Sequence, residues 1–231
     1  MNNDERHVWI LDGELYVDDD GNLVEIRYDY DCENPRRDDD GIYSTFLTWA
    51  RGYSSPDENP YDYPDELAGD MGIYDEDGCN GSLFDLIRGM NEMGWVALPV
   101  SMVDHSSIAY RAGHPSQFVG AYPWDAGYVG LIYASESAIK EGLMVDEVTD
   151  EIRERVIGHL ENEVRYYSDW ADGTCYGFVK YDRHGEEIDS CWGFIGDDAT
   201  TNGIEDHVGR LHECSYHTVE EYVEDSEGKV A

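Results

Sequence analysis

The sequence predicts an α+β fold, in which a mostly antiparallel sheet of hairpins packs on one long amphipathic helix and one or two shorter helices. Two segments with alternating apolar residues, each folded about a turn rich in Asp, predict the hairpins. A later segment repeats apolar residues every four positions, which predicts the long helix. Because 41% of residues are hydrophobic and 13% aromatic, the chain has enough apolar side chains to bury a core.

The first hairpin is expected near the start of the chain. Apolar residues alternate along 7–11 and 14–17, residues 18–22 supply an Asp-Asp-Asp-Gly-Asn turn, and residues 23–30 return. Such a turn also resembles part of a calcium loop, but the downstream Glu and flanking helices are missing, so a solvated turn is favoured.

The next segment carries the only adjacent basic pair of the sequence, Arg36 and Arg37. Pairing with neighbouring Asp side chains is the favoured interpretation, and an anion clamp is the alternative. Residues 42–51 predict a short helix or strand. Residues 54–82 are rich in Pro, Asp, Gly and Tyr without a period, which predicts an irregular acidic loop segment.

Regular structure resumes with a helix over 82–93, capped by Ser82 and ended by Gly94. A buried strand over 95–103, a second over 128–134 and a short helical turn over 136–142 follow. The long helix is expected to begin near Asp146, which can cap it. Its buried face carries Val148, Ile152, Val156, Leu160 and Val164.

The last part predicts a second hairpin, with strands over 174–181 and 186–195, then a short helix over 204–211 and a frayed acidic C-terminal tail. The length favours a single domain over residues 1–231.

The least ordinary feature is charge. The sequence has 52 Asp and Glu against 15 Lys and Arg, a formal net charge of −37, and self-repulsion on this scale opposes compactness. Adaptation to high salt is one explanation, which the scarcity of Lys beside Arg fits. Mimicry of a nucleic acid is another, because carboxylates can occupy a groove built for phosphates. Direct binding to nucleic acid is disfavoured, since this charge repels the backbone.

The long helix carries much of this charge on the face opposite its apolar stripe. A charged row is usually a solvated face, and a phosphate-mimicking stripe that binds a basic partner is the alternative. The residues of the candidate stripe are Asp150, Glu151, Glu154 and Glu161, with Glu163 on the same face.

The five cysteines are odd in number, widely spaced and without a C-x-x-C pair, so neither a zinc ribbon nor a disulfide framework is indicated. We expect a reducing cytoplasm, that of a host cell. No apolar run approaches a membrane span, and the first residues lack a signal-peptide pattern. The sequence predicts no cofactor and no metal, and it leaves the oligomeric state open.

Chemistry is concentrated in the stretch 98–130, where polar turns lie between two apolar strands. Asp104 and His105 end the first strand, and Asp125 begins the second. With Cys191 they are the candidate catalytic residues: a general base or metal ligand, a second carboxylate, and a thiolate. The spacings match no strong metal or nucleophile motif, so capping and core roles are the favoured alternative.

Several motifs resemble an uncharacterised family of phage and mobile-element proteins. They are Asp104-His105-Ser106, then Pro123-Trp124-Asp125-Ala126-Gly127, and Asp189-Ser190-Cys191-Trp192-Gly193-Phe194. The resemblance covers most of the chain in the same order and implies a common origin and one fold more than a chemistry. The sequence departs from the pattern at Ser107, where Gly is usual, and at Ala126, where Ser is usual, which puts any reaction at these positions in doubt.

Two functions follow from these observations. In the first, the chain is a mobile-element accessory protein that binds a basic nucleic-acid-binding host protein, a defence or DNA-processing protein, as a nucleic-acid mimic. In the second, it is a small metal-assisted hydrolase with its site at Asp104-His105 and Asp125, and its acidity is halophilic adaptation.

Overall fold

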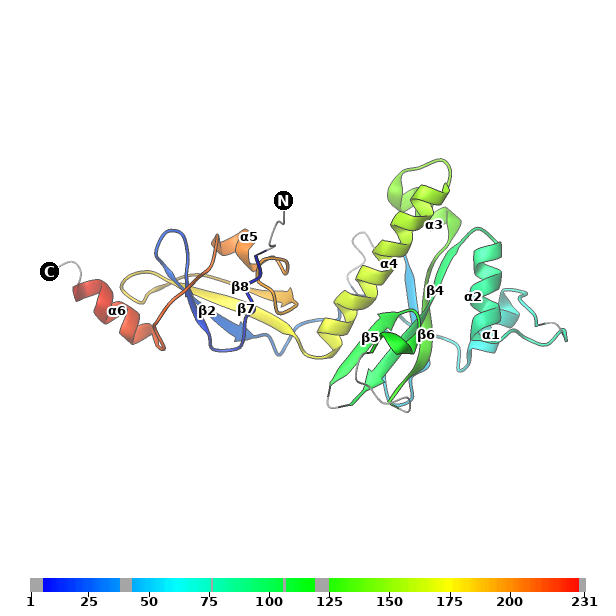
Figure 1. Cartoon of the computed structure of the whole chain (residues 1–231), viewed down its shortest axis with the longest axis horizontal. Coiled ribbons are helices and arrows are strands. Elements are labelled where there is room, and N and C mark those ends of the chain that lie inside the picture. The colour runs from blue at the N-terminus through cyan, green and yellow to red at the C-terminus, as the bar shows by residue number, and fades with distance from the viewer. Residues whose placement is uncertain (1–5, 38–42, 76, 106, 119–124, 229–231) are drawn as a thin grey trace. The chain divides into compact units, whose positions relative to one another are not determined.

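The computed structural model describes residues 6–37, 43–75, 77–105, 107–118 and 125–228, and it has the predicted α+β composition. It holds two antiparallel sheets rather than one. The chain divides into two compact units: unit 1 comprises Met1–Glu33 and Gly173–Ala231, and unit 2 is Asn34–Asp172 (Figure 1). The inserted unit 2 builds its own sheet and its own hydrophobic cores, and the single domain that the length predicts stays a prediction.

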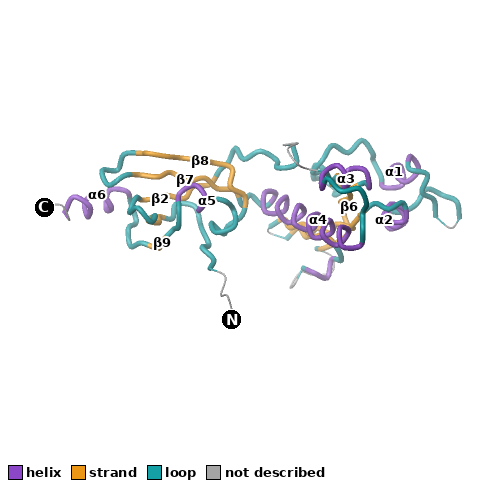
Figure 2. Tube along the Cα trace, turned by 90° about the horizontal axis from the view of Figure 1, so that it is seen from above, coloured by secondary structure: helices purple, strands orange, loops and turns teal. Residues whose placement is uncertain are grey.

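Unit 1 is built on the two predicted hairpins, which pair with each other. The strand order is β8-β7-β2-β1-β9, and Ile26 lies opposite Phe178 where the hairpins meet (Figure 2). The strands are β1 (Leu15–Val17), β2 (Leu23–Tyr28), β7 (Cys175–Tyr181), β8 (Glu187–Ile195) and β9 (His212–Glu213).

Two short helices complete unit 1. Helix α5 (Ile204–Val208) buries Ile204 and Val208 in the core of the sheet. The prediction of a frayed tail is wrong for its described part, because helix α6 (Val219–Gly228) forms there. Tyr222 anchors this helix: its side chain is buried, and its hydroxyl donates to the Gly21 carbonyl at 2.7 Å.

A disulfide joins Cys32 to Cys175, although the cysteine spacing gives no sign of one. The two residues are 143 positions apart, and both lie beside the points where the chain passes between the units. The pairing of β2 with β7 brings the two segments together, with Tyr28 opposite Tyr176. Cys79, Cys191 and Cys214 are free thiols.

Unit 2 has three layers. Its sheet has the order β3-β6-β4-β5, with helix α4 over one face and α1 and α2 over the other (Figure 1). Short α3 and the 3-10 turn η1 complete it. The bounds are β3 (Thr45–Thr48), α1 (Pro64–Asp70), α2 (Leu83–Glu92), β4 (Val96–Asp104), β5 (Ile108–Ala112), η1 (Pro115–Gln117), β6 (Ala126–Ala134), α3 (Glu136–Leu143) and α4 (Asp150–Ala171).

The helices of unit 2 begin at local signals, although two of them differ from the predictions above. The Ser82 hydroxyl accepts from the Asp85 N–H and begins α2, as expected. The cap of α4 is Thr149 rather than Asp146, since the Thr149 hydroxyl accepts from the Ile152 N–H. Helix α1 lies inside the segment predicted to be irregular. No helix in the described part of the chain is long and apolar enough to cross a bilayer.

Gly130 lies in the middle of β6, opposite Thr48 of β3 and Val100 of β4. A Cβ atom there would collide with the Leu47 carbonyl oxygen and the Thr48 backbone, so only glycine allows the two strands to approach. Gly158, inside α4, has no described atom beyond its own stretch of helix within 4 Å of where its Cβ would lie.

We expect Gly130→Ala to lower the free energy of unfolding by roughly 1–3 kcal/mol, because β3 must move away. The matched Gly158→Ala should raise it by about 1 kcal/mol, because alanine has the higher helix propensity. Urea unfolding followed by circular dichroism measures both values. Equal effects of the two substitutions would contradict the packing of β3 on Gly130.

Candidate functional site

The structure brings three of the four candidate catalytic residues together in unit 2. Asp104 ends β4 and its N–H donates to the Asp125 carbonyl at 3.2 Å, because β4 and β6 pair with Val103 opposite Ala126. His105 follows, with its Nδ1 3.5 Å from Asp125 Oδ2. Cys191 does not belong to this group, since it lies in β8 of unit 1, half-buried against that core.

The group contains one short hydrogen bond and one longer contact between a histidine and a carboxylate. The Tyr53 hydroxyl donates to Asp104 Oδ2 at 2.7 Å, and this hydrogen bond raises the pKa of the Tyr53 phenol. The distance from His105 to Asp125 exceeds that of a hydrogen bond, and the His105 side chain is 66% exposed. A general base held in place by a carboxylate needs a closer contact. Ser106, Pro123 and Trp124 of the same motifs lie outside the described residues.

In the part of the chain that the structure describes, Asp104, His105 and Asp125 are not grouped as three side chains with ligand atoms within reach of one another. Among the described residues, the one group of three side chains placed to hold a metal ion is Asp29, Cys32 and Cys175, and its two cysteines form the disulfide.

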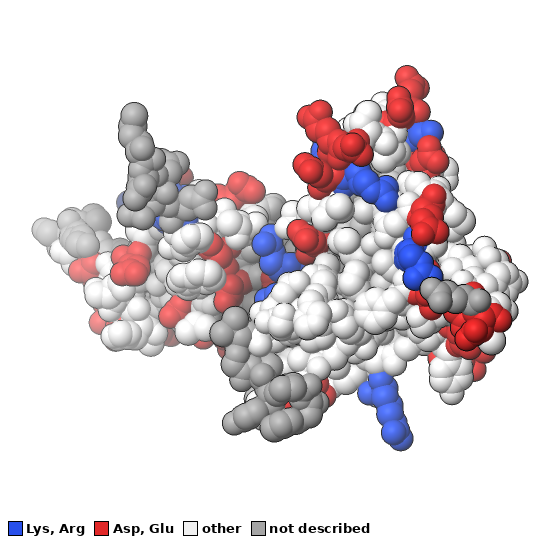
Figure 3. Space-filling model, turned by 45° about the vertical axis from the view of Figure 1, so that its right-hand side comes forward, with Lys and Arg blue, Asp and Glu red and all other residues white. Residues whose placement is uncertain are grey.

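The acidic residues of α4 separate into two kinds. The four residues of the predicted stripe, Asp150, Glu151, Glu154 and Glu161, are exposed. Exposed carboxylates of α3 and of the loop before α4 extend the row, and Asp and Glu gather at this part of unit 2 (Figure 3). We call this group the acidic end. It consists of Glu141, Asp146, Glu147, Asp150, Glu151 and Glu154.

Glu163 is not part of this surface, although the helical spacing placed it there. Its carboxylate accepts hydrogen bonds from Arg36 and from the Ser44 hydroxyl, and its Oε1 lies 2.7 Å from His159 Nε2. It faces inward because it lies at the edge of the helix face that carries Leu160 and Val164.

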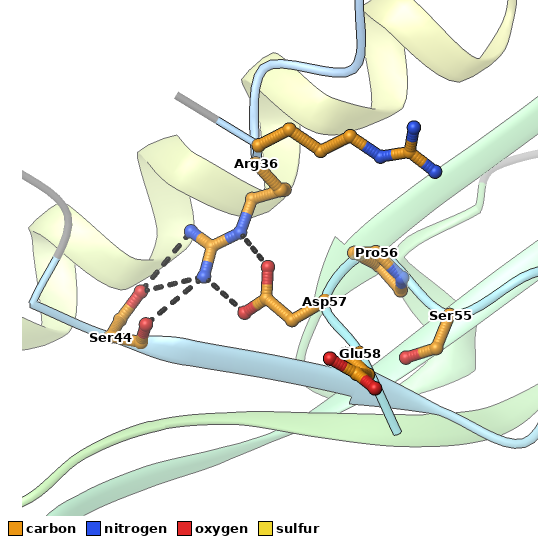
Figure 4. A pocket seen from close by; sticks show the side chains of 7 residues that line it. Arg36, Ser44, Ser55, Pro56, Asp57 and Glu58 are labelled. Carbon is orange, nitrogen blue, oxygen red and sulfur yellow. Dashed lines mark hydrogen bonds and ion pairs between the residues drawn. The ribbon is translucent and has the colours of Figure 1, made fainter. Parts of the chain in front are cut away.

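Arg36 is the centre of a buried polar network. The Asn34-Pro35 turn positions it, since the Asn34 side chain accepts from the Arg36 N–H at 2.9 Å. The side chain is only 3% exposed and donates to both oxygens of Asp57, at 2.9 and 2.6 Å (Figure 4). It also donates to the Ser44 carbonyl at 3.1 Å. The partners of Arg36 among the described residues are distant in sequence, whereas Asp38, Asp39 and Asp40, with which pairing is expected, lie outside the described residues.

The positive charge of Arg36 is neutralised by carboxylates of the protein itself. Burial alone would lower the pKa of Arg36, because it disfavours the charged guanidinium. The hydrogen bonds and ion pairs with Asp57 and Glu163 have the larger effect, so the pKa of Arg36 is raised. A hollow of about 570 Å³ beside the network is also lined by Arg37, Ser55 and Glu58. Because the Arg36 guanidinium is already held by two carboxylates, it has no remaining charge with which to clamp an anion.

Local patterns could not reveal this network. The Asn-Pro pair marks a turn at its start, but nothing near Arg36 in the sequence indicates Asp57 or Glu163 as partners. Helix α1, in contrast, has a readable signal, since Pro64 is followed by two acidic residues and then by the buried pair Leu67 and Ala68.

Comparison with known proteins does not supply a function. The chain matches no protein-family model, no curated protein and no solved structure. The resemblance to phage and mobile-element proteins stays a prediction, and the function has to be inferred from the residues described above.

We expect Arg36→Met to destabilise the protein by about 3–5 kcal/mol, because it leaves two carboxylates without their cation. The exposed pair Arg88–Asp85 provides the control, and Arg88→Met should cost about 0.5 kcal/mol or less. Chemical denaturation measures both. If the unpaired carboxylates cause the destabilisation, adding Glu163→Gln to Arg36→Met will restore part of the lost free energy of unfolding. A further decrease in that free energy would contradict this explanation.

Proposed function

We propose that this chain acts by binding a basic nucleic-acid-binding protein of a host cell, with its carboxylates in the place of nucleic-acid phosphates. The observation that carries the proposal is the acidic end, where six exposed carboxylates occur within residues 141–154. A protein that binds nucleic acid neutralises several phosphates with Lys and Arg, and a fixed row of carboxylates offers it the same charge. The packed helix α4 supports part of this row.

An exposed apolar side chain within the same segment also supports recognition. Met144 is 92% exposed and has a left-handed backbone, with φ of 53°. Such a conformation is uncommon for a residue other than glycine. Methionine adapts its shape to a partner surface, so Met144 can provide apolar contact between the charges. Part of the charge has a local role, because Asp150 and Glu151 stabilise the first turn of α4.

We expect the triple substitution Glu147→Gln, Glu151→Gln and Glu154→Gln to weaken binding to the partner at least about tenfold, because complementary charges are lost at the interface. The tagged protein is used to capture partners from host lysate at low salt, with and without duplex DNA, and the captured proteins are identified by mass spectrometry. The expected result is a nucleic-acid-binding protein that the DNA displaces.

The control variant carries Glu186→Gln, Glu220→Gln and Glu224→Gln, which alter exposed glutamates of unit 1. Its net charge equals that of the test variant. It should capture the partner as well as the unchanged protein does. If both triple variants lose the partner equally, the interaction depends on overall charge and the proposal fails. Capture that DNA does not affect would also contradict mimicry.

The alternative function, a metal-assisted hydrolase, is favoured by one observation: Asp104, His105 and Asp125 lie at the same end of the sheet. If it is correct, the protein supplied with divalent metal ions will hydrolyse members of a nucleotide and phosphoester panel. His105→Ala should then reduce the rate at least about 100-fold, while the exposed His114 of the same unit can be replaced by alanine without loss. No turnover by the unchanged protein would exclude this function.

A further inference from the structure

A second hollow, of about 400 Å³, lies in unit 1 and is unconnected with the function proposed above. Its position follows from the pairing of β1 with β9, which sets Tyr16 opposite Glu213. The lining residues that matter are of two kinds, aromatic rings and carboxylates. They are Trp9, Tyr16, Tyr216, Glu14 and Glu213.

The aromatic side chains are held in place by the rest of unit 1. Trp9 is 62% exposed, and His7 stacks on its indole with 5.5 Å between ring centroids. The Tyr16 hydroxyl lies 3.0 Å from the Trp9 carbonyl oxygen, and the side chain is buried. Tyr216 donates to Asp225 at 2.6 Å and packs edge-on against Tyr222. Hydrogen bonds therefore hold Tyr16 and Tyr216 in the free protein, while Trp9 is supported on one side by His7.

The two carboxylates give the hollow a negative potential. Glu14 Oε2 lies 2.8 Å from the Tyr16 hydroxyl and accepts from the Leu11 N–H at 3.0 Å, so its position is set. Among the residues that the structure describes, neither Glu14 nor Glu213 takes part in an ion pair. The pKa of the Tyr16 phenol is raised, mainly by burial. The hydrogen bond with Glu14 and the negative charges of Glu14 and Glu213 raise it further. The phenol stays neutral, and the negative charge belongs to the carboxylates.

We propose that this hollow binds an organic cation, an ammonium or guanidinium group on an apolar stem. Aromatic faces attract such a cation through their quadrupoles, and nearby carboxylates neutralise its charge. A bare metal ion fits less well, because the described residues here provide no group of three metal ligands within reach of one another. The source of the cation is either a free quaternary ammonium compound or the side chain of a basic peptide.

Nuclear magnetic resonance of the full chain labelled with nitrogen-15 tests the proposal at pH 8. The indole N–H signal of Trp9 is assigned by its loss in Trp9→Phe. Three probes are titrated at constant salt: choline, Nα-acetyl-arginine methylamide, and 3,3-dimethylbutan-1-ol, the uncharged isostere of choline. We expect at least one cation to shift the Trp9 signal saturably, and the isostere to bind about tenfold more weakly.

Two variants locate the charge that matters. Glu213→Gln should weaken cation binding about tenfold and leave the isostere unchanged, while Glu186→Gln, which removes an exposed charge elsewhere in unit 1, should have less than about a twofold effect. Tighter binding of choline identifies a free ammonium compound as the source, and tighter binding of the arginine probe identifies a basic peptide. No saturable shift with either cation, equal binding of the isostere, or equal effects of the two variants would overturn the proposal.

Discussion

The structure of unit 2 depends on the buried guanidinium of Arg36. It joins the first residues of the unit to Ser44 before β3, to Asp57 in the loop after β3, and to Glu163 of α4. An arginine suits this position because its five donors lie in one plane and can reach several acceptors. Without the cation, Asp57 and Glu163 would be two carboxylates close together in a poorly solvated place, and their repulsion would oppose the packing of α4 on the sheet.

Other Lys and Arg side chains also join distant segments of the chain. Lys180 reaches Asp18, whose carboxylate is buried, at 2.6 Å, and Arg6 binds Glu205 at 2.7 Å. Arg153 donates to the carbonyl of Trp95, which holds α4 to the start of β4. Each of these bonds joins segments that are far apart in the sequence. Since several of the 15 basic residues are used in this way, the exposed surface keeps an excess of carboxylates, and the buried pairs are screened less by salt than surface pairs.

Local elements could be predicted from the sequence, and long-range relations could not. Ser82 and Gly94 bound α2 because caps act on neighbouring backbone groups, and alternating residues gave both hairpins of unit 1. The division into two units, the Cys32–Cys175 bond and the partners of Arg36 all require knowledge of which strands pair. The same holds at the candidate site: Asp104, His105 and Asp125 meet because β4 and β6 are neighbours, and Cys191 belongs to another unit.

The distribution of charge bears on why the chain is so acidic. Adaptation to salt needs carboxylates that hold water, and it can spread them anywhere on a surface. Recognition needs carboxylates at particular places beside groups that contact a ligand. The acidic end has six exposed carboxylates in the segment that also carries the exposed Met144, and the hollow of unit 1 has two beside aromatic rings. Hydration does not require an exposed methionine or an exposed tryptophan in these positions, since each costs apolar contact with water. Both arrangements therefore support the proposed binding roles of the charge at these two places.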